Sequence, residues 1–265
     1  MRTAPKRAAL AAAITALATL ALTSASQGEV VRQGNLQGSF NGGISPQKLP
    51  RTTLAQVSVT MGGKIATTDR STPPKLERIV LAINSHGALQ TKGLATCSLA
   101  KLNSLPSKEA KKTCAGALVG HGNVTSRVSL PGQGAFASNA ELLAFNGRLH
   151  GHQAVLAQVS SGAPLPLTYV IGFEVLKTKG TFGTTLAATL PPIASEYGYI
   201  SAFNLALSRS YQSHGKQLSF ASASCPAPKG FTQAPFPFAK ASYSFADGRT
   251  LSATLNRDCK VRGNR

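Results

Sequence analysis

Alternating apolar and polar residues at positions 167–190 constrain the fold of this 265-residue chain more than any other feature. In residues 167–175 every second side chain is apolar, which is the period of a half-buried β-strand. After a break near Thr178-Lys179 the alternation resumes, now at the even positions. Folding the chain back at this break gathers the apolar residues on one face of a β-hairpin. The expected cross-strand pairs are Val175 with Phe182, Phe173 with Thr184, Ile171 with Leu186 and Leu167 with Leu190.

The same alternation recurs along most of the chain, with turn-forming residues between the segments. We predict further strands at residues 55–66, 76–84, 118–130, 142–149, 153–160, 199–207, 217–225, 238–246 and 249–257. About ten to twelve strands joined by tight turns must bury one face, either in two packed sheets or by closing into a barrel. The predicted fold class is therefore all-β, an antiparallel β-sandwich or a curved meander. Most strands have one polar face, which favours the sandwich.

Three glycine-containing segments suggest local geometry. The turn at His150-Gly151-His152 is expected to place Phe145 opposite Ala157. Gly62-Gly63 is expected to bend or bulge its strand. Near the C-terminus, a three-residue loop over 246–248 with its glycine in the left-handed conformation keeps the flanking apolar residues on one face.

One segment, residues 98–113, is predicted to be a short helical insertion. Leu99, Leu102 and Leu105 recur every three residues, and a helix-forming stretch follows Pro106.

The chain has four cysteines, which in an exported protein indicate two disulfides. Three pairings are formally open, and spacing favours Cys97–Cys114 and Cys225–Cys259. The first pair closes a short loop around the helical insertion, and the second ties a strand end to the end of the chain. Zinc is the alternative, but no C-x-x-C pair or cysteine-proximal histidine supports it.

The N-terminus has the three parts of a secretory signal peptide. Basic residues precede an apolar run over 8–22, and Thr23-Ser24-Ala25 suits cleavage after Ala25. The run is short and rich in alanine for a membrane span, and no later stretch is long and apolar enough for one. We therefore expect a secreted chain without a transmembrane segment after cleavage.

The mature chain is expected to begin with an arm and continue as one domain. Residues 26–53 are rich in Gln, Gly, Asn and Ser, so we predict a flexible arm that donates one short strand near residues 36–40. Residues 54–260 are long enough to bury a sizeable core as a single β domain.

The chain is strongly basic, with 28 Lys and Arg against nine acids and a formal charge of +19. Cleavage after residue 25 removes three basic residues and no acid, which leaves +16. Such a surface attracts anionic partners such as cell-wall polymers or lipid headgroups. Most basic residues are scattered, as on an ordinary solvated surface, and we predict no specific nucleic acid as a partner. The candidate anion contacts are Lys108, Lys111, Lys112, Arg257, Lys260 and Arg262.

Motifs of catalysis and metal binding are missing from the sequence, so we predict no catalytic residue, no metal and no cofactor. Each of the five histidines has a glycine neighbour and is expected at a turn. The sequence contains no G-x-S-x-G, H-E-x-x-H or G-x-x-x-x-G-K-[ST] motif. A Ser-His-Asp site assembled in space, for example with His121 or His214, stays open. The chain has no Trp for a carbohydrate-binding platform.

Five segments of the later part of the chain are similar to a family of uncharacterised secreted proteins from soil actinobacteria. They are G-A-L-V-G at 116–120, L-A-F-N-G at 143–147, K-G-T-F-G-T at 179–184, S-C-P-A-P-K-G-F at 224–231 and F-A-D-G-R-T-L at 245–251. The resemblance covers roughly residues 54–262, and its last two motifs are the most specific. It implies export and a shared β fold. It transfers no catalytic residue, because the family has no established activity.

Three functions are compatible with these observations. The sequence favours an exported, non-enzymatic β-sandwich protein that acts at or near the cell envelope and binds anionic polymers. The first alternative is a secreted hydrolase whose site is assembled from turns. The second is a barrel-like carrier of an apolar ligand.

Overall fold

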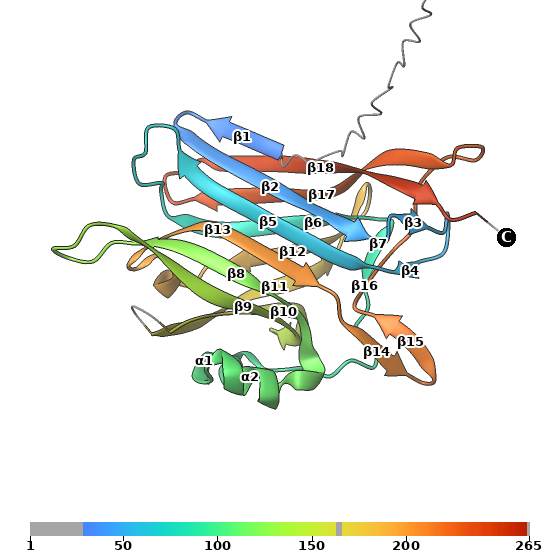
Figure 1. Ribbon diagram of the computed structural model, residues 1–265, viewed down its shortest axis with the longest axis horizontal. Coiled ribbons are helices and arrows are strands. Elements are labelled where there is room, and N and C mark those ends of the chain that lie inside the picture. Colours follow the sequence, from blue (N-terminus) through green and yellow to red (C-terminus); the bar gives the residue numbers. More distant parts are fainter. Residues whose placement is uncertain (1–28, 163–165, 264–265) are drawn as a thin grey trace, which may run out of the picture.

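A computed structural model describes residues 29–162 and 166–263, and it confirms an all-β fold with a short helical insertion (Figure 1). The signal peptide expected over residues 1–25 lies outside the described residues. The described part contains eighteen strands, more than the ten to twelve expected. The difference arises because the segments predicted at 55–66 and 217–225 each form two strands, and residues 29–49 form three strands where one was expected. Two short strands at Gly87–Leu89 and Ser210–Ser213 were not expected.

Thirteen of the strands form one large, mostly antiparallel sheet that curls on itself (Figure 1). The first half of this sheet contains, in spatial order, β1 (Glu29–Gln33), β2 (Leu36–Ser45), β5 (Ser58–Thr67), β13 (Gly198–Leu207), β8 (Leu118–Val128) and β9 (Phe136–Leu149). The second half continues with β10 (His152–Ser161), β11 (Leu167–Lys177), β12 (Phe182–Thr189), β6 (Leu76–Asn84), β17 (Gln233–Phe245), β18 (Thr250–Val261) and β3 (Lys48–Leu49). The sheet is curved, and it is not the two-sheet sandwich that we favoured. A polar outer face does not distinguish the two, because curling also buries one face and exposes the other.

The edges of the curled sheet meet where β1 and β2 approach β18 (Figure 1). Hydrogen bonds from two arginines of the β17–β18 hairpin join them. Nη1 of Arg249 donates to Oδ1 of Asn35 at 2.7 Å. Nε of Arg257 donates to the carbonyl oxygen of Gly42 at 2.6 Å. These contacts hold the inner faces of both edges against a common interior.

A small sheet of three short strands, which we call the cap, lies across one end of the curled sheet (Figure 1). Its middle strand is β16 (Ala221–Ala223), which pairs with β4 (Ala55–Gln56) and β7 (Gly87–Leu89). The hairpin of β14 (Ser210–Ser213) and β15 (Lys216–Ser219) precedes β16 in the chain. A short 3₁₀ helix, η2 (Pro192–Ser195), connects β12 to β13.

The helical insertion covers the outer face of the sheet at β9 and β10. It consists of α1 (Leu99–Ser104), α2 (Ser107–Thr113) and the 3₁₀ turn η1 (Ala115–Ala117). Leu102 is fully buried, in a cluster of apolar side chains that includes Phe145 of β9. The buried amide of Gln158 on β10 fixes the insertion in place, because its Nε2 donates to the carbonyl oxygens of Leu102 and Leu105 at 2.7 and 2.8 Å.

The hairpin of β11 and β12 forms, but its register differs by four residues from the expected one. Val175 lies opposite Leu186 instead of Phe182. The connecting loop is correspondingly longer, and Oγ1 of Thr178 donates to the Phe182 carbonyl oxygen at 2.6 Å. A shift by an even number of residues leaves every side chain on its original face. The alternation of apolar and polar residues therefore predicts correctly which face Ile171 occupies, but it does not predict which residue lies opposite on the neighbouring strand.

The register expected for β9 and β10 is wrong by one residue. The turn contains two residues, His150-Gly151, both with positive φ of 50° and 82°, and Phe145 lies opposite Leu156 instead of Ala157. The expected register assumed that β9 and β10 bury one face and expose the other. Both faces are in fact buried here, because Leu143 and Phe145 pack under the helical insertion.

We expected a bend or a bulge at Gly62-Gly63. In the described residues β5 pairs with β2 continuously from Ser58 to Thr67, without a bulge. The two glycines instead permit close approach of neighbouring groups. A Cβ on Gly63 would lie 2.7 Å from the ring of Phe203, a contact that a larger residue cannot make without displacing it.

Residues 29–49 belong to the curled sheet, where we expected a flexible arm with one short strand near 36–40. Leu36, Phe40 and Ile44 point into the core from β2. Glycines interrupt this apolar alternation, which is why the sequence pattern reads as weak. Gly38 lies close to β18, because an added Cβ would lie 2.9 Å from Cδ1 of Leu251, which would have to shift.

Several local predictions are confirmed. β6 has the expected bounds, and Gly248 has the left-handed φ of 82° in the predicted three-residue loop between β17 and β18. Both disulfides have the favoured pairing. Cys97–Cys114 closes the helical insertion, and Cys225–Cys259 ties the segment that follows β16 of the cap to β18.

We predict that replacing Cys225 and Cys259 by alanine lowers the free energy of unfolding by about 3–4 kcal/mol, because the unfolded chain gains loop entropy. Urea denaturation measures the loss. The matched variant that replaces Cys97 and Cys114 should lose slightly less, since its loop spans 17 positions against 34. Equal stability of the first variant and the wild type would contradict the role of this disulfide in holding the cap.

Candidate functional site: an apolar cavity

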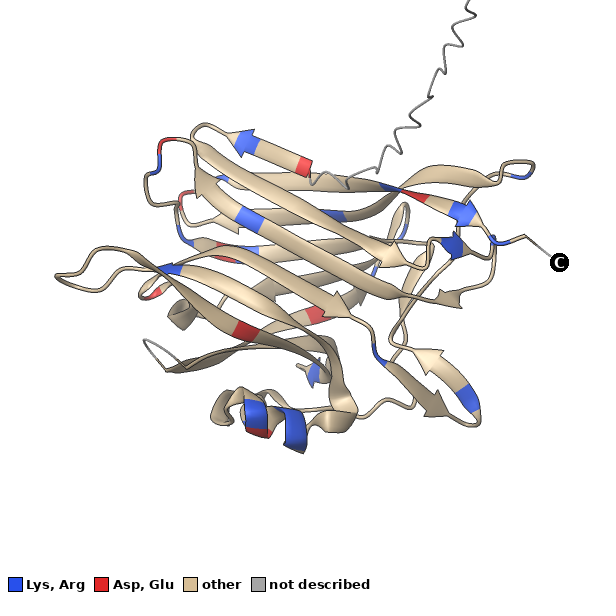
Figure 2. Ribbon diagram, viewed as in Figure 1, with Lys and Arg blue, Asp and Glu red and all other residues tan. Residues whose placement is uncertain are grey.

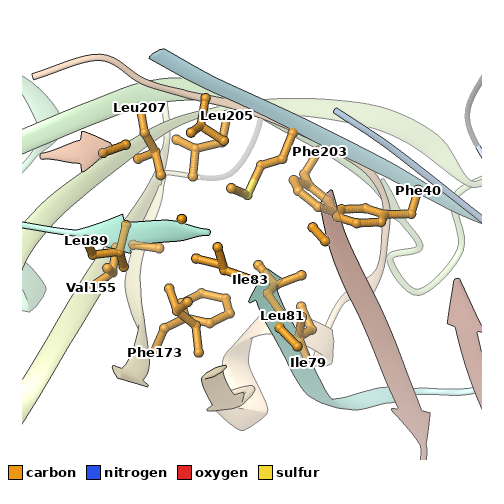
Figure 3. A pocket seen from close by; sticks show the side chains of 18 of the residues that line it. Phe40, Ile79, Leu81, Ile83, Leu89, Val155, Phe173, Phe203, Leu205 and Leu207 are labelled. Atoms are coloured by element: carbon orange, nitrogen blue, oxygen red, sulfur yellow. The ribbon is translucent and has the colours of Figure 1, made fainter. Parts of the chain in front are cut away.

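An apolar cavity of about 130 Å³ lies inside the curled sheet (Figure 3). Its walls come from both halves of the sheet, including Phe40 of β2, Leu205 of β13, Val155 of β10 and Phe173 of β11. The cap closes one end, where Leu89 of β7 lines the space. Figure 3 shows these side chains converging from opposite strands on one space. An apolar cavity of about 150 Å³ binds benzene, so this one has room for a molecule of about that size.

Small inward-facing residues explain why this core is not filled. Protein cores normally contain few voids larger than a water molecule. Here Ala157 of β10, Ala239 of β17 and both terminal alanines of β16, Ala221 and Ala223, lie in the cavity wall. Alanine thus occupies inward positions where a larger side chain would fill part of the space.

The wall of the cavity is almost entirely hydrocarbon. Ser222, in the middle strand of the cap, is the only polar residue of the wall among the described residues, and the wall contains no titratable group. The hydroxyl of Ser222 is buried without a hydrogen-bond partner in the described part of the chain. Such a space binds apolar molecules through burial of their surface, and it offers no acid, base or nucleophile with an activating partner.

Two tyrosines are buried near the cavity. Desolvation raises the pKa of Tyr169 on β11 to about 12, and it raises that of Tyr243 on β17 as well. The ring of Tyr243 belongs to the core, with 2 % of its surface exposed. Both phenols therefore stay neutral under physiological conditions.

The candidate anion contacts do not converge. Lys108, Lys111 and Lys112 lie on α2, whereas the other three lie on or just after β18, in a different part of the molecule (Figures 1 and 2). Lys111 forms an ion pair with Glu141. Burial opposes ionisation of the Glu141 carboxyl, but hydrogen bonds from Lys111 and Ser107 outweigh it and lower its pKa.

The second group of candidate contacts is partly occupied by structural hydrogen bonds. Arg257 on β18 donates to the carbonyl oxygen of Gly42 on β2, where the two edges of the sheet meet. Nη2 of Arg262 donates to the carbonyl oxygen of Lys48 at 3.4 Å. Lys260 lies beside Lys48 in the parallel pairing of β18 with β3. This pairing adds Lys48 to the basic group, a neighbour that the sequence alone did not indicate because 212 positions separate the two lysines.

The histidines are dispersed, and the described residues contain no group of three or more potential metal ligands. His121, expected at a turn, lies within β8. His150 forms an exposed pair with Glu174, whose Oε1 lies 2.7 Å from Nδ1 of the imidazole.

One Ser–His contact was not foreseen from the sequence. Nδ1 of His86 lies 3.1 Å from Oγ of Ser224, beyond the end of β6. Ser224 is only 3 % exposed, so a substrate carbonyl cannot reach it. Within the described residues, no carboxylate hydrogen-bonds to this imidazole. The pair therefore resembles a structural hydrogen bond more closely than a nucleophile with its base.

Comparison with known proteins gives no further assignment. No protein-family model, curated protein or solved structure matches the chain significantly. The resemblance to secreted actinobacterial proteins stays a prediction. Within residues 29–162 and 166–263, no helix is long and apolar enough to cross a membrane.

Proposed function

We propose that this protein is an exported, non-enzymatic binding protein that holds a small apolar molecule inside its curled sheet. The single observation that carries the proposal is the cavity of about 130 Å³ with hydrocarbon walls. The sequence left two alternatives to polyanion binding, a secreted hydrolase and a carrier of an apolar ligand. The cavity favours the carrier, because its wall is apolar.

The energetics of an empty cavity support a ligand. At about 24 cal/mol per Å³, a void of this size costs roughly 3 kcal/mol of stability. A single Ala-to-Leu replacement in the wall would recover part of this cost, yet the sequence keeps alanine at several inward positions. An apolar ligand offsets the same cost by burying its own surface, at about 25 cal/mol per Å².

Export is supported by two independent features. The two disulfides are typical of an oxidising compartment outside the cytoplasm. The first 25 residues carry the signal-peptide pattern. The cell envelope and its surroundings are therefore the proposed location.

We predict that toluene raises the thermal unfolding temperature of the oxidised protein and that Ala157→Met abolishes most of this shift. Ligand that binds only the folded state stabilises it by about 1.4 kcal/mol at ten times its Kd. A methionine at position 157 fills the same space, because Ala157 lies in the cavity wall.

The matched control is Ala187→Met on β12, a neighbour of the cavity-lining Leu186 that faces the opposite side of the sheet. This variant should keep the toluene shift of the wild type. Absence of any shift in the wild type, or an undiminished shift in Ala157→Met, would rule out the cavity as the binding site.

Binding of anionic polymers is the second candidate, and the net charge favours it. Counterion release makes such binding strongly salt-dependent, with losses of about 10³-fold or more between 50 and 200 mM salt for six or more ionic contacts. We predict that retention on heparin falls steeply over this range. Replacing Lys48, Lys260 and Arg262 together by glutamine should weaken it more than the same change at Lys108, Lys111 and Lys112, since Lys111 is already paired with Glu141. Retention that is independent of salt would exclude this candidate.

A further inference from the structure

A buried hydroxyl without a partner lies next to the cavity. Tyr243 projects inward from β17, opposite Ile79 of β6 and Leu251 of β18. It is among the largest fully buried side chains. Its hydroxyl has no hydrogen-bond partner in the described part of the chain.

This hydroxyl is unusual for the position that it occupies. Buried tyrosines normally direct the O–H group to an acceptor. Ala241 and Phe245, the neighbouring inward residues of β17, are purely apolar, and a phenylalanine at position 243 would fill the same core without leaving a polar group unpaired. Desolvation by this surrounding hydrocarbon is also what raises the pKa of Tyr243.

The backbone of β5 makes room for the Tyr243 hydroxyl. A Cβ added to Gly63 would lie 2.8 Å from this hydroxyl oxygen and 2.7 Å from the ring of Phe203. The glycine thus creates a notch in the sheet, and the phenolic oxygen lies in it. Any other residue at position 63 would have to displace the tyrosine or the phenylalanine.

The notch opens onto a second, smaller cavity of about 20 Å³. Tyr243 and Gly63 line this space, and its wall shares Ile79, Ile200 and Phe203 with the main cavity. Figure 3 shows Ile79 and Phe203 on the side of the main cavity that lies away from Leu89 of the cap. Tyr243 therefore lines a small cavity that adjoins the main one at the end opposite the cap.

We propose that the ligand is an apolar molecule with one hydroxyl or carbonyl group and that this group hydrogen-bonds to the hydroxyl of Tyr243. The inference rests on the proposed function, since it specifies the ligand of the same cavity. The apolar body fills the main space, and the polar group extends past Phe203 into the small one. A neutral phenol is both a donor and an acceptor, so it accommodates either group.

A single water is the competing occupant of the small cavity, because about 20 Å³ exceeds the roughly 10–15 Å³ that one water requires. A water would satisfy the hydroxyl without any consequence for ligand choice. The two explanations differ in whether Tyr243 changes the preference between ligands that differ only in a hydroxyl.

The test compares toluene with p-cresol, which adds one hydroxyl to the same skeleton, in the wild type and in Tyr243→Phe. Titration calorimetry gives the ratio of the two dissociation constants for each protein. We expect the preference for p-cresol to fall about fivefold in Tyr243→Phe, which is the loss of one neutral hydrogen bond of about 1 kcal/mol. Affinity for toluene should change little, because the ring of residue 243 is retained.

Tyr211→Phe on β14 is the matched control. Tyr211 is also a buried residue, but its hydroxyl donates to the carbonyl oxygens of Gln90 and Lys92, away from the cavity. This variant should keep the wild-type preference for p-cresol. If the preference is the same in Tyr243→Phe and the wild type while toluene still binds, the hydroxyl has no role in recognition and the inference is wrong. If neither compound binds the wild type, the proposed function itself fails.

Discussion

The curled sheet must bury one continuous apolar face against itself, and most of the other features of this fold serve that requirement. Thirteen strands in a single layer expose a face too large to be covered by two short helices. Curling the layer brings the inner face of β2 and β5 opposite that of β6, β17 and β18. Arg249 and Arg257 stabilise this closure through side-chain hydrogen bonds, so the two edges need not pair through their backbones as neighbouring strands do. The cap then covers the end of the curl that the strands leave open.

The helical insertion solves a second, local problem of burial. At β9 and β10 both faces of the sheet are apolar, so the outer one needs a cover. The insertion provides it through Leu102, and the Cys97–Cys114 disulfide closes the loop that contains both helices. Gln158, a buried amide on that outer face, is paired with helix carbonyl groups and so specifies where the insertion docks.

The sequence predicts those features that depend on which face a side chain occupies. The bounds of β6, the loop at Gly248 and both disulfides follow from alternation, turn chemistry and spacing. The register of β11 with β12 does not, because an even shift leaves the faces unchanged. The register of β9 with β10 is predicted wrongly for a different reason. Both faces of the sheet are buried there, so the strands lack the alternation of apolar and polar residues from which a register can be predicted.

The candidate site is harder to foresee than the fold. An inward alanine such as Ala157 has the same sequence signature whether its neighbours fill the space or leave a cavity. Gly63 and Tyr243 lie close together although 180 positions separate them, and the sequence suggested only a bend or a bulge at that glycine. Chemical motifs carried no information, because the proposed site uses shape and one hydroxyl in place of a catalytic group.

The whole proposal depends on an apolar cavity of about 130 Å³ inside the curled sheet. Xenon enters such cavities under pressure and is visible by its anomalous scattering. Diffraction from xenon-pressurised crystals should give a strong peak between Phe173 of β11 and Leu205 of β13, inside the sheet. Side chains packed across that space, with no xenon bound there, would show that the sheet encloses no cavity.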